Sequence, residues 1–163
     1  MTSQSMPLQA STPARSNVLQ RVLATDSHLA GPLLRLTLAV VMFPHGAQKL
    51  LGWWGGYGFE GTMGFLTGTV GLPWILGLGV VLLEFFGPLL LLAGLATRPV
   101  ALAFAGIMVG AIASVHGSHG FFMNWSGAAA GEGFEYHLLV IGMALALATL
   151  GGGRFSADRK LAV

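Results

Sequence analysis

The chain contains no cysteine and few charged residues, and each shortage excludes a set of functions. Without cysteine the protein forms no disulfide and has no thiol of its own for redox chemistry. Any electron transfer would therefore need a cofactor, a quinone-like substrate or a partner protein. Charged residues make up 9% of the 163 residues and hydrophobic residues 54%, whereas soluble domains carry about 25% charged residues. This composition indicates a membrane protein, with the lipid bilayer as its main partner.

The surplus of positive charge is also small, since the formal net charge is only +2. That surplus is too small and too scattered for nucleic acid, whose binding proteins concentrate lysine and arginine on one face. Residues 1–29 are polar and lack the apolar core of about 7–15 residues that a signal peptide carries. We therefore expect a flexible polar tail over residues 1–29, which includes a short interfacial helix around residues 18–23.

Four apolar segments are long enough, at about 20 residues each, to cross a bilayer as helices. They cover residues 32–51, 72–96, 99–116 and 134–150. The predicted fold class is an all-α membrane protein, a four-transmembrane-helix bundle over residues 30–152. Arg98 and Pro99 are expected to separate the second span from the third, and the glycines from Gly151 onward to end the fourth. Gly106 and Gly110, at GxxxG spacing, predict close packing of the third span on a neighbour.

Basic residues predict the orientation of this bundle. With four spans, both termini and the turn at residue 98 face one side of the membrane, and Lys49 faces the other. The basic residues on the first side are Arg15, Arg21, Arg98, Arg154, Arg159 and Lys160. Cytoplasmic segments carry the excess of lysine and arginine, so both termini are predicted to be cytoplasmic. Residues 153–163 would then form a cytoplasmic tail.

Three ionisable residues fall inside the predicted spans, where such residues are rare and face the bundle interior. If the first two spans are centred near residues 41 and 84, Glu84 lies at the midplane. Arg35 then lies roughly 9 Å to the cytoplasmic side and His45 roughly 6 Å to the outer side. Arg35 can reach Glu84, and a paired charge costs far less than an unpaired one. We predict an Arg35–Glu84 ion pair that serves a site or locks the bundle; snorkelling of Arg35 to the interface is the alternative.

Polar and aromatic side chains gather at the outer end of the predicted bundle. His45, Gln48 and Lys49 share one helix face, and the next segment holds two tryptophans and several glycines that could form a lid with a short helix around residues 59–66. The end of the third span and the start of the fourth add His116, His119, Asn124, Trp125, Glu132, Glu135, Tyr136 and His137.

Two chemistries suit this outer group of residues. Histidine and carboxylate can hydrogen-bond quinone carbonyls and move protons near neutral pH. The same side chains could instead bind zinc, copper or iron. His116 and His119 form only a weak HxxH pair and no metal motif is completed, so the pattern favours a quinone pocket over a metal site.

Several segments resemble the DoxX family of bacterial membrane proteins. LLRLTLAVVMFPHGAQKLLGWWGGYGFEGTMGFL is similar to its first span and loop, LGVVLLEFFGPLLLLAGLATR to its second span, and GGGRFSADR to its tail. The resemblance implies a multi-pass protein of the bacterial inner membrane, linked to quinone or thiosulfate:quinone oxidoreduction and to resistance against oxidants and electrophiles. The residues of this chain that match polar positions of the family are Arg35, His45, Gln48, Lys49 and Glu84.

The first functional hypothesis is the membrane component of a quinone-linked redox system, working with a soluble or membrane redox partner. Glu84 and His45 would exchange protons, Arg35 would orient Glu84, and Lys49 with the tryptophan pair would gate entry. The predicted quinone contacts are Gln48, Lys49, Trp53, Trp54, His116, His119, Asn124, Trp125 and His137. Two other hypotheses stay open. One is a non-enzymatic anchor or assembly subunit of a redox complex. The other is a small-solute or metal transporter, which four spans would support only as a homo-oligomer.

Overall fold

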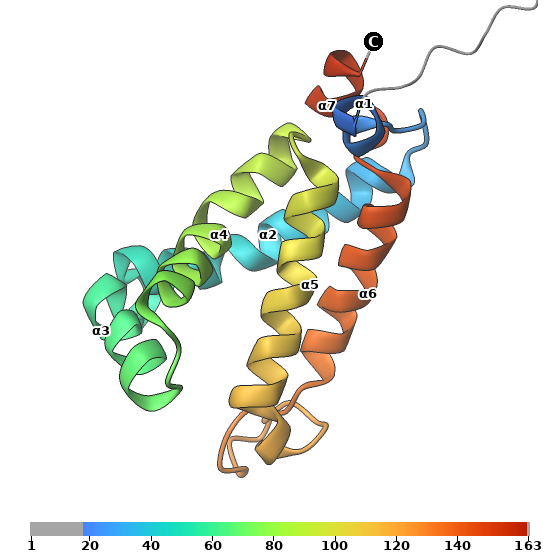
Figure 1. Cartoon of the computed structure of the whole chain (residues 1–163). Coiled ribbons are helices and arrows are strands. Elements are labelled where there is room, and N and C mark those ends of the chain that lie inside the picture. The colour runs from blue at the N-terminus through green and yellow to red at the C-terminus, as the bar shows by residue number, and fades with distance from the viewer. Residues whose placement is uncertain (1–17, 163) are drawn as a thin grey trace, which may run out of the picture.

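The computed structural model of the chain describes residues 18–162, and every regular element in that range is helical. Residues 1–17 of the predicted N-terminal tail, with Arg15, lie outside this range. The four long helices are α2 (Ala30–Leu51), α4 (Trp74–Ala93), α5 (Thr97–Ser114) and α6 (Glu135–Leu150). Each occupies one of the four predicted segments (Figure 1).

Short helical elements connect and flank these four. The two expected short helices form as α1 (Val18–Leu23) and α3 (Gly58–Gly64). The remaining elements are a 3₁₀ turn η1 (Trp53–Gly55), a π-helical turn η2 (Phe65–Thr69), a second 3₁₀ turn η3 (His116–His119) and the C-terminal helix α7 (Ala157–Leu161).

Two of the long helices are long and apolar enough to cross a membrane, among the residues that the structure describes. They are α4 with 20 residues and α5 with 18. The apolar helix α6 is shorter, at 16 residues. Helix α2 has 22 residues, but its sequence includes Arg35, His45, Gln48 and Lys49. By length and composition, α4 and α5 are thus candidate membrane spans.

The break between α4 and α5 lies earlier than predicted. Helix α4 ends at Gly94, which adopts a left-handed conformation with φ 66°, and the N–H of Leu95 donates to the Leu90 carbonyl. A left-handed glycine commonly ends a helix in this way, because the N–H groups that follow it donate to carbonyls of the last turn. Pro99 lies inside the first turn of α5, where its missing N–H has no helical partner to lose.

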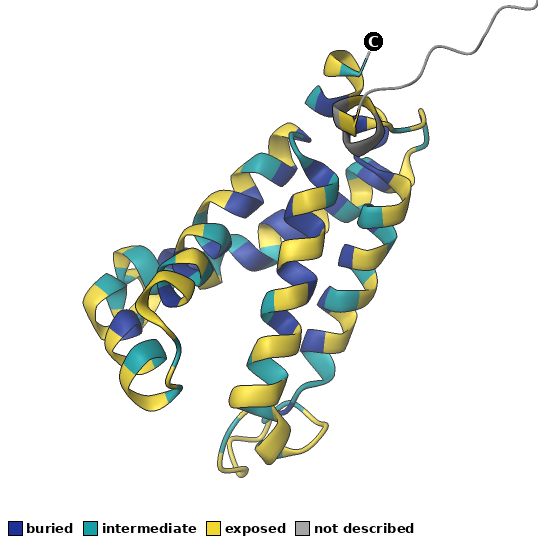
Figure 2. Ribbon diagram, in the orientation of Figure 1, coloured by how far each residue is buried: buried dark blue, intermediate teal, exposed yellow. Residues whose placement is uncertain are grey.

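The long helices form two antiparallel pairs, α2 with α4 and α5 with α6, which contact each other mainly through α4 with α5 and α2 with α6. The pairs are close at the end where α1 and α7 lie and diverge toward the other end (Figure 1). Fully buried side chains such as Leu38, Leu91, Phe104 and Leu147 fill the region where they meet. Exposed residues lie along the outward faces of the long helices (Figure 2), and they include large apolar residues such as Leu33 and Leu139. Extensive exposed apolar surface fits a lipid environment better than water.

The predicted GxxxG contact is wrong. Positions 106 and 110 both border open space, and a Cβ atom added at either would meet nothing within 4 Å. The close backbone contacts of the long helices involve other glycines instead. Gly31 of α2 lies against the backbone of Gly152, and Gly46 of α2 lies against the backbone of α4 at Glu84.

The end of the bundle at which α1 and α7 lie is closed by buried polar contacts. The Asp158 carboxylate, 2% exposed, accepts hydrogen bonds from the N–H groups of Ala96 and Thr97 at 2.7 and 2.8 Å, where α5 begins. Arg98 donates to the carbonyls of Ala148 and Thr149 at the end of α6. Charged side chains thereby satisfy backbone groups that helix ends leave unpaired.

Candidate functional site

Proline and glycine set the crossing of α2 and α4. Position 88 in α4 is proline, so the carbonyl four residues earlier, that of Glu84, receives no helical N–H. Gly46 of α2 fits against this carbonyl, and a Cβ atom at position 46 would overlap it. The crossing therefore fixes Glu84 beside the last turns of α2, which carry His45 and Lys49.

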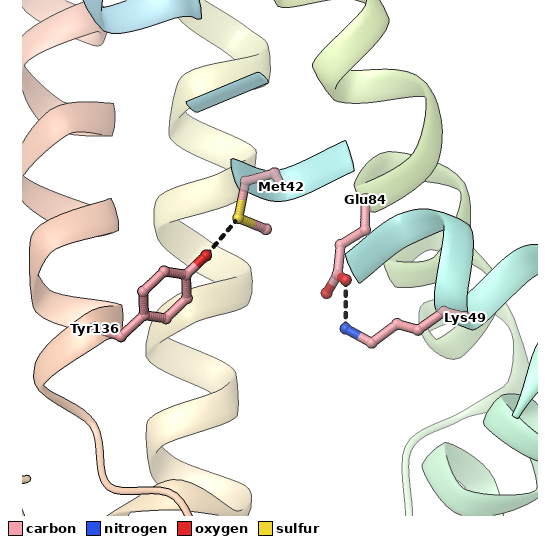
Figure 3. A network of polar contacts seen from close by, with 4 residues as sticks. All are labelled: Met42, Lys49, Glu84 and Tyr136. Atoms are coloured by element: carbon pink, nitrogen blue, oxygen red, sulfur yellow. Dashed lines mark hydrogen bonds and ion pairs between the residues drawn. The ribbon is translucent and has the colours of Figure 1, made fainter. Parts of the chain in front are cut away.

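Glu84 forms an ion pair with Lys49, and its side chain is only 2% exposed whereas that of Lys49 is 34% exposed. The Nζ atom of Lys49 donates to Oε2 of Glu84 (Figure 3). A carboxylate buried this deeply needs such a partner, because an unpaired buried charge is strongly destabilising.

The predicted Arg35–Glu84 pair is wrong. The depth estimate set Glu84 level with residue 41, but the contact with Gly46 sets it roughly 7 Å closer to the C-terminal end of α2. Arg35 lies at the other end of the bundle, buried at 4% exposure. Its guanidinium donates to the carbonyls of Leu91 and Leu92 in α4 and to those of Arg154 and Phe155. Backbone carbonyls, not Glu84, take its hydrogen bonds.

A cavity of about 180 Å³ lies beside the ion pair, between the two helix pairs. Its lining comes from α2, α4, α5, η3, the following loop and α6. The lining residues are Met42, His45, Lys49, Glu84, Met108, Ala111, His116, Met123, Glu132, Tyr136 and His137. The predicted residues Glu84, His45, Lys49, His116 and His137 are thus brought together around one space.

Four rings follow one another along the cavity. The centroids of His45 and Tyr136 are 5.8 Å apart, those of Tyr136 and His137 5.6 Å, and those of His137 and His116 4.2 Å. The Tyr136 hydroxyl donates to the sulfur of Met42 at 3.4 Å (Figure 3). Together these side chains form a row of aromatic rings in the wall of the cavity that the Lys49–Glu84 pair also lines.

The hydrogen bonds of the two adjacent histidines differ. His116 Nδ1 lies 2.9 Å from the Glu132 carbonyl. Because a carbonyl only accepts, Nδ1 carries the proton, and in the neutral ring the lone pair is on Nε2. His137 is 6% exposed, and its Nδ1 has no hydrogen-bond partner within the described residues.

The other predicted site residues lie outside the cavity. Gln48 contacts the Trp54 carbonyl at 3.5 Å. The exposed aromatic side chains are Trp53 at 49%, Trp54 at 64% and Trp125 at 87%. Asn124 closes its own loop through two hydrogen bonds with the backbone of Ala129, and His119 packs against Gly131.

Methionines are the lining residues that the sequence analysis missed. Met42, Met108 and Met123 carry no charge or hydrogen-bond donor, so nothing distinguishes them from lipid-facing residues in a long apolar run. One signal could have found Met42, because it precedes His45 by three residues and Lys49 by seven. These positions share a helix face. Glu132 and Tyr136 were recognised as part of the outer group but were given no role.

No group of three or more His, Asp or Glu side chains is placed to hold a metal ion in the part of the chain that the structure describes. The charged groups on the cavity wall are Lys49, Glu84 and Glu132. What the site offers is therefore a buried ion pair, aromatic rings and thioethers around a small space. Such a site can hold a ring by apolar contact and exchange protons with it.

The fold and the site define a class: an all-helical protein with two candidate membrane spans and a small, partly open cavity between two helix pairs. The chain belongs to the DoxX family, whose model matches residues 31–117. It is also 35% identical over 125 residues to a protein of Bacillus subtilis (strain 168) named "Putative oxidoreductase CatD", an alignment that covers 77% of this chain and 81% of that protein. No solved structure matches the chain.

Proposed function

We propose that the protein is the membrane component of a quinone-linked redox system that defends the cell against oxidants and electrophiles. The cavity would hold a single quinone or quinol ring between the Lys49–Glu84 pair and the row of rings at Tyr136. The observation that carries this proposal is the buried ion pair on the wall of a ring-sized space. The oxidoreductase name of the Bacillus subtilis relative supports the redox role.

The size of the cavity favours one ring. An apolar cavity of about 150 Å³ is sufficient to bind benzene, whereas drug-sized ligands occupy pockets of about 300–1,000 Å³. A space of about 180 Å³ therefore suits one six-membered ring with its substituent oxygens. A longer isoprenoid tail would have to remain outside, in the lipid.

The lining supplies groups for both redox states of such a ring. The Lys49 ammonium can donate to a quinone carbonyl, and the Glu84 carboxylate can accept from a quinol hydroxyl. Oxidation of a quinol releases two electrons and two protons. Glu84 and His45 would take the protons, and a partner protein would take the electrons, because this chain has no cysteine. Quinone reduction is the reverse of this step.

The same proposal includes a membrane arrangement. All four long helices would cross the bacterial inner membrane, with both termini in the cytoplasm and the cavity in the outer half. The contacts of Arg35 and Arg98 already join the helix ends and the C-terminal segment on one side. The positive-inside rule assigns that basic side to the cytoplasm.

Replacing Glu84 by glutamine should weaken binding of a short-tailed benzoquinol, kept reduced under anaerobic conditions, by at least about tenfold, the scale of losing one hydrogen bond to a charged group. Isothermal titration calorimetry on detergent-purified protein measures the dissociation constant. Glu60→Gln is the matched control, because Glu60 is an exposed carboxylate in α3. Unchanged affinity in Glu84→Gln, or an equal loss in Glu60→Gln, would contradict the proposal.

One observation favours the alternative role of a membrane anchor. The Lys49–Glu84 pair and Gly46 also hold α2 on α4, so they could serve packing alone. His45 separates the two functions, because it is exposed and forms no hydrogen bond within the described residues. In the redox protein, His45→Ala lowers quinone-dependent turnover without changing stability. In an anchor it changes neither.

A further inference from the structure

We propose that the α5–α6 side of this cavity binds a soft monovalent cation, Cu(I), through His116, His137 and the thioethers of Met108 and Met123. All four residues line the cavity. The inference concerns a metal site and does not rest on quinone binding. The proposed copper ligands line the same cavity as the proposed quinone ring, so Cu(I) and quinone should exclude each other.

The two histidines are prepared for metal binding. The Nδ1–H of His116 donates to the Glu132 carbonyl at 2.9 Å, which is the outer-shell hydrogen bond that most metal-binding histidines make. This bond leaves the Nε2 lone pair free. His137 is 6% exposed and its Nδ1 lacks a partner within the described residues. With ring centroids 4.2 Å apart, the two imidazoles can serve one ion.

Thioethers complete the donor set. Of the five methionines in the described range, Met42, Met108 and Met123 line this one cavity. The sulfur of Met42 already accepts from the Tyr136 hydroxyl, which leaves Met108 and Met123 as the sulfur donors in the cavity that His116 and His137 also line. Thioether sulfur is a soft ligand that selects Cu(I), whereas carboxylates and water suit harder ions.

The charge of the cavity wall disfavours an anion as the occupant, and the types of ligand disfavour zinc. The cavity is lined by two carboxylates, Glu84 and Glu132, and by one ammonium, Lys49. Their formal sum of −1 suits a monovalent cation and disfavours an anion. Zinc sites use Cys, His, Asp and Glu ligands in sets of three or four, and within the described residues no such group of three is present.

The test uses full-length protein purified in detergent and titrated anaerobically with Cu(I) against the chromophoric chelator bicinchoninate. We expect one Cu(I) per chain, displacement by Ag(I) and no displacement by Zn(II). Met108→Leu and Met123→Leu should each weaken Cu(I) binding by at least about tenfold, a scale taken from second-shell changes in metal sites. Both keep an apolar side chain of similar volume, so thermal unfolding should change little.

Met63→Leu and Met143→Leu are the matched controls, because both methionines lie in the described range but outside the cavity lining. They should leave Cu(I) affinity unchanged. Sulfur scattering in the copper X-ray absorption spectrum should weaken in Met108→Leu and not in Met63→Leu. Far less than one Cu(I) per chain, or equal effects of cavity and control variants, would overturn the copper site. Quinone titration of the copper-free protein is a separate measurement, so the copper site can fail while quinone binding stands, and the reverse.

Discussion

Replacing Lys49 by alanine is expected to lower the free energy of unfolding by about 3 kcal/mol. Glu84 is 2% exposed, and removing its partner leaves a buried carboxylate without compensation. Breaking a buried ion pair costs about 3–5 kcal/mol, and the low end applies here because the Lys49 side chain is 34% exposed. Denaturant unfolding in detergent micelles measures the change, and Lys160→Ala, at an exposed position in α7, should cost little.

A double variant tests the mechanism of this loss. If the cost arises from the unpaired Glu84 charge, Lys49→Met combined with Glu84→Gln should recover most of it, because neither residue then carries a charge. A double-mutant cycle gives the coupling energy between the two positions. Losses that simply add, with no coupling, would show that Lys49 does not compensate Glu84 in the folded protein.

Replacing Gly46 by alanine is expected to cost about 3 kcal/mol or more, or to prevent folding. The added Cβ atom would overlap the backbone of α4 at Glu84, and a helix backbone cannot rotate away as a side chain can. Overpacking of this kind costs about 1–3 kcal/mol when side chains can adjust, and occasionally more. Separating α2 from α4 would also weaken the Lys49–Glu84 pair.

Gly106→Ala is the matched control for this substitution. Gly106 also lies inside a long helix, but a Cβ atom there meets nothing within 4 Å. Alanine is favoured over glycine in a helix interior by roughly 0.5–1 kcal/mol, so this variant should be as stable as the wild type or more so. Equal unfolding midpoints for Gly46→Ala and wild type would contradict the crossing described for α2 and α4.

Hydrophobic patterning was sufficient to locate the long helices but not to set how they cross. The four apolar segments and the glycine at position 151 predicted α2, α4, α5 and α6 closely. Depth along each helix then suggested Arg35 as the partner of Glu84. That estimate fails because the Gly46 contact, which pattern alone does not reveal, shifts one helix along the other.

The candidate site was predicted in part for a similar reason. His45, His116 and His137 stood out because ionisable residues are conspicuous in an apolar sequence. Met108 and Met123 did not, since an apolar residue that faces a cavity looks like one that faces lipid. The sequence pattern places Trp125 and Asn124 at the same end of the bundle as the site residues. In the structure, however, the Trp125 side chain is 87% exposed, and Asn124 hydrogen-bonds within its own loop, so both lie outside the cavity.

The central claim, that a quinone ring occupies the cavity, is tested most directly by protection of an introduced thiol. The chain has no cysteine, so Ala111→Cys, in the cavity wall, gives a single reactive site. Ala113→Cys, two residues further along α5 at an exposed position, is the control. A fully substituted short-tailed quinone, which cannot add the thiol, should slow labelling by methanethiosulfonate at position 111 and not at position 113. Equal labelling rates at position 111 with and without the quinone would contradict the claim.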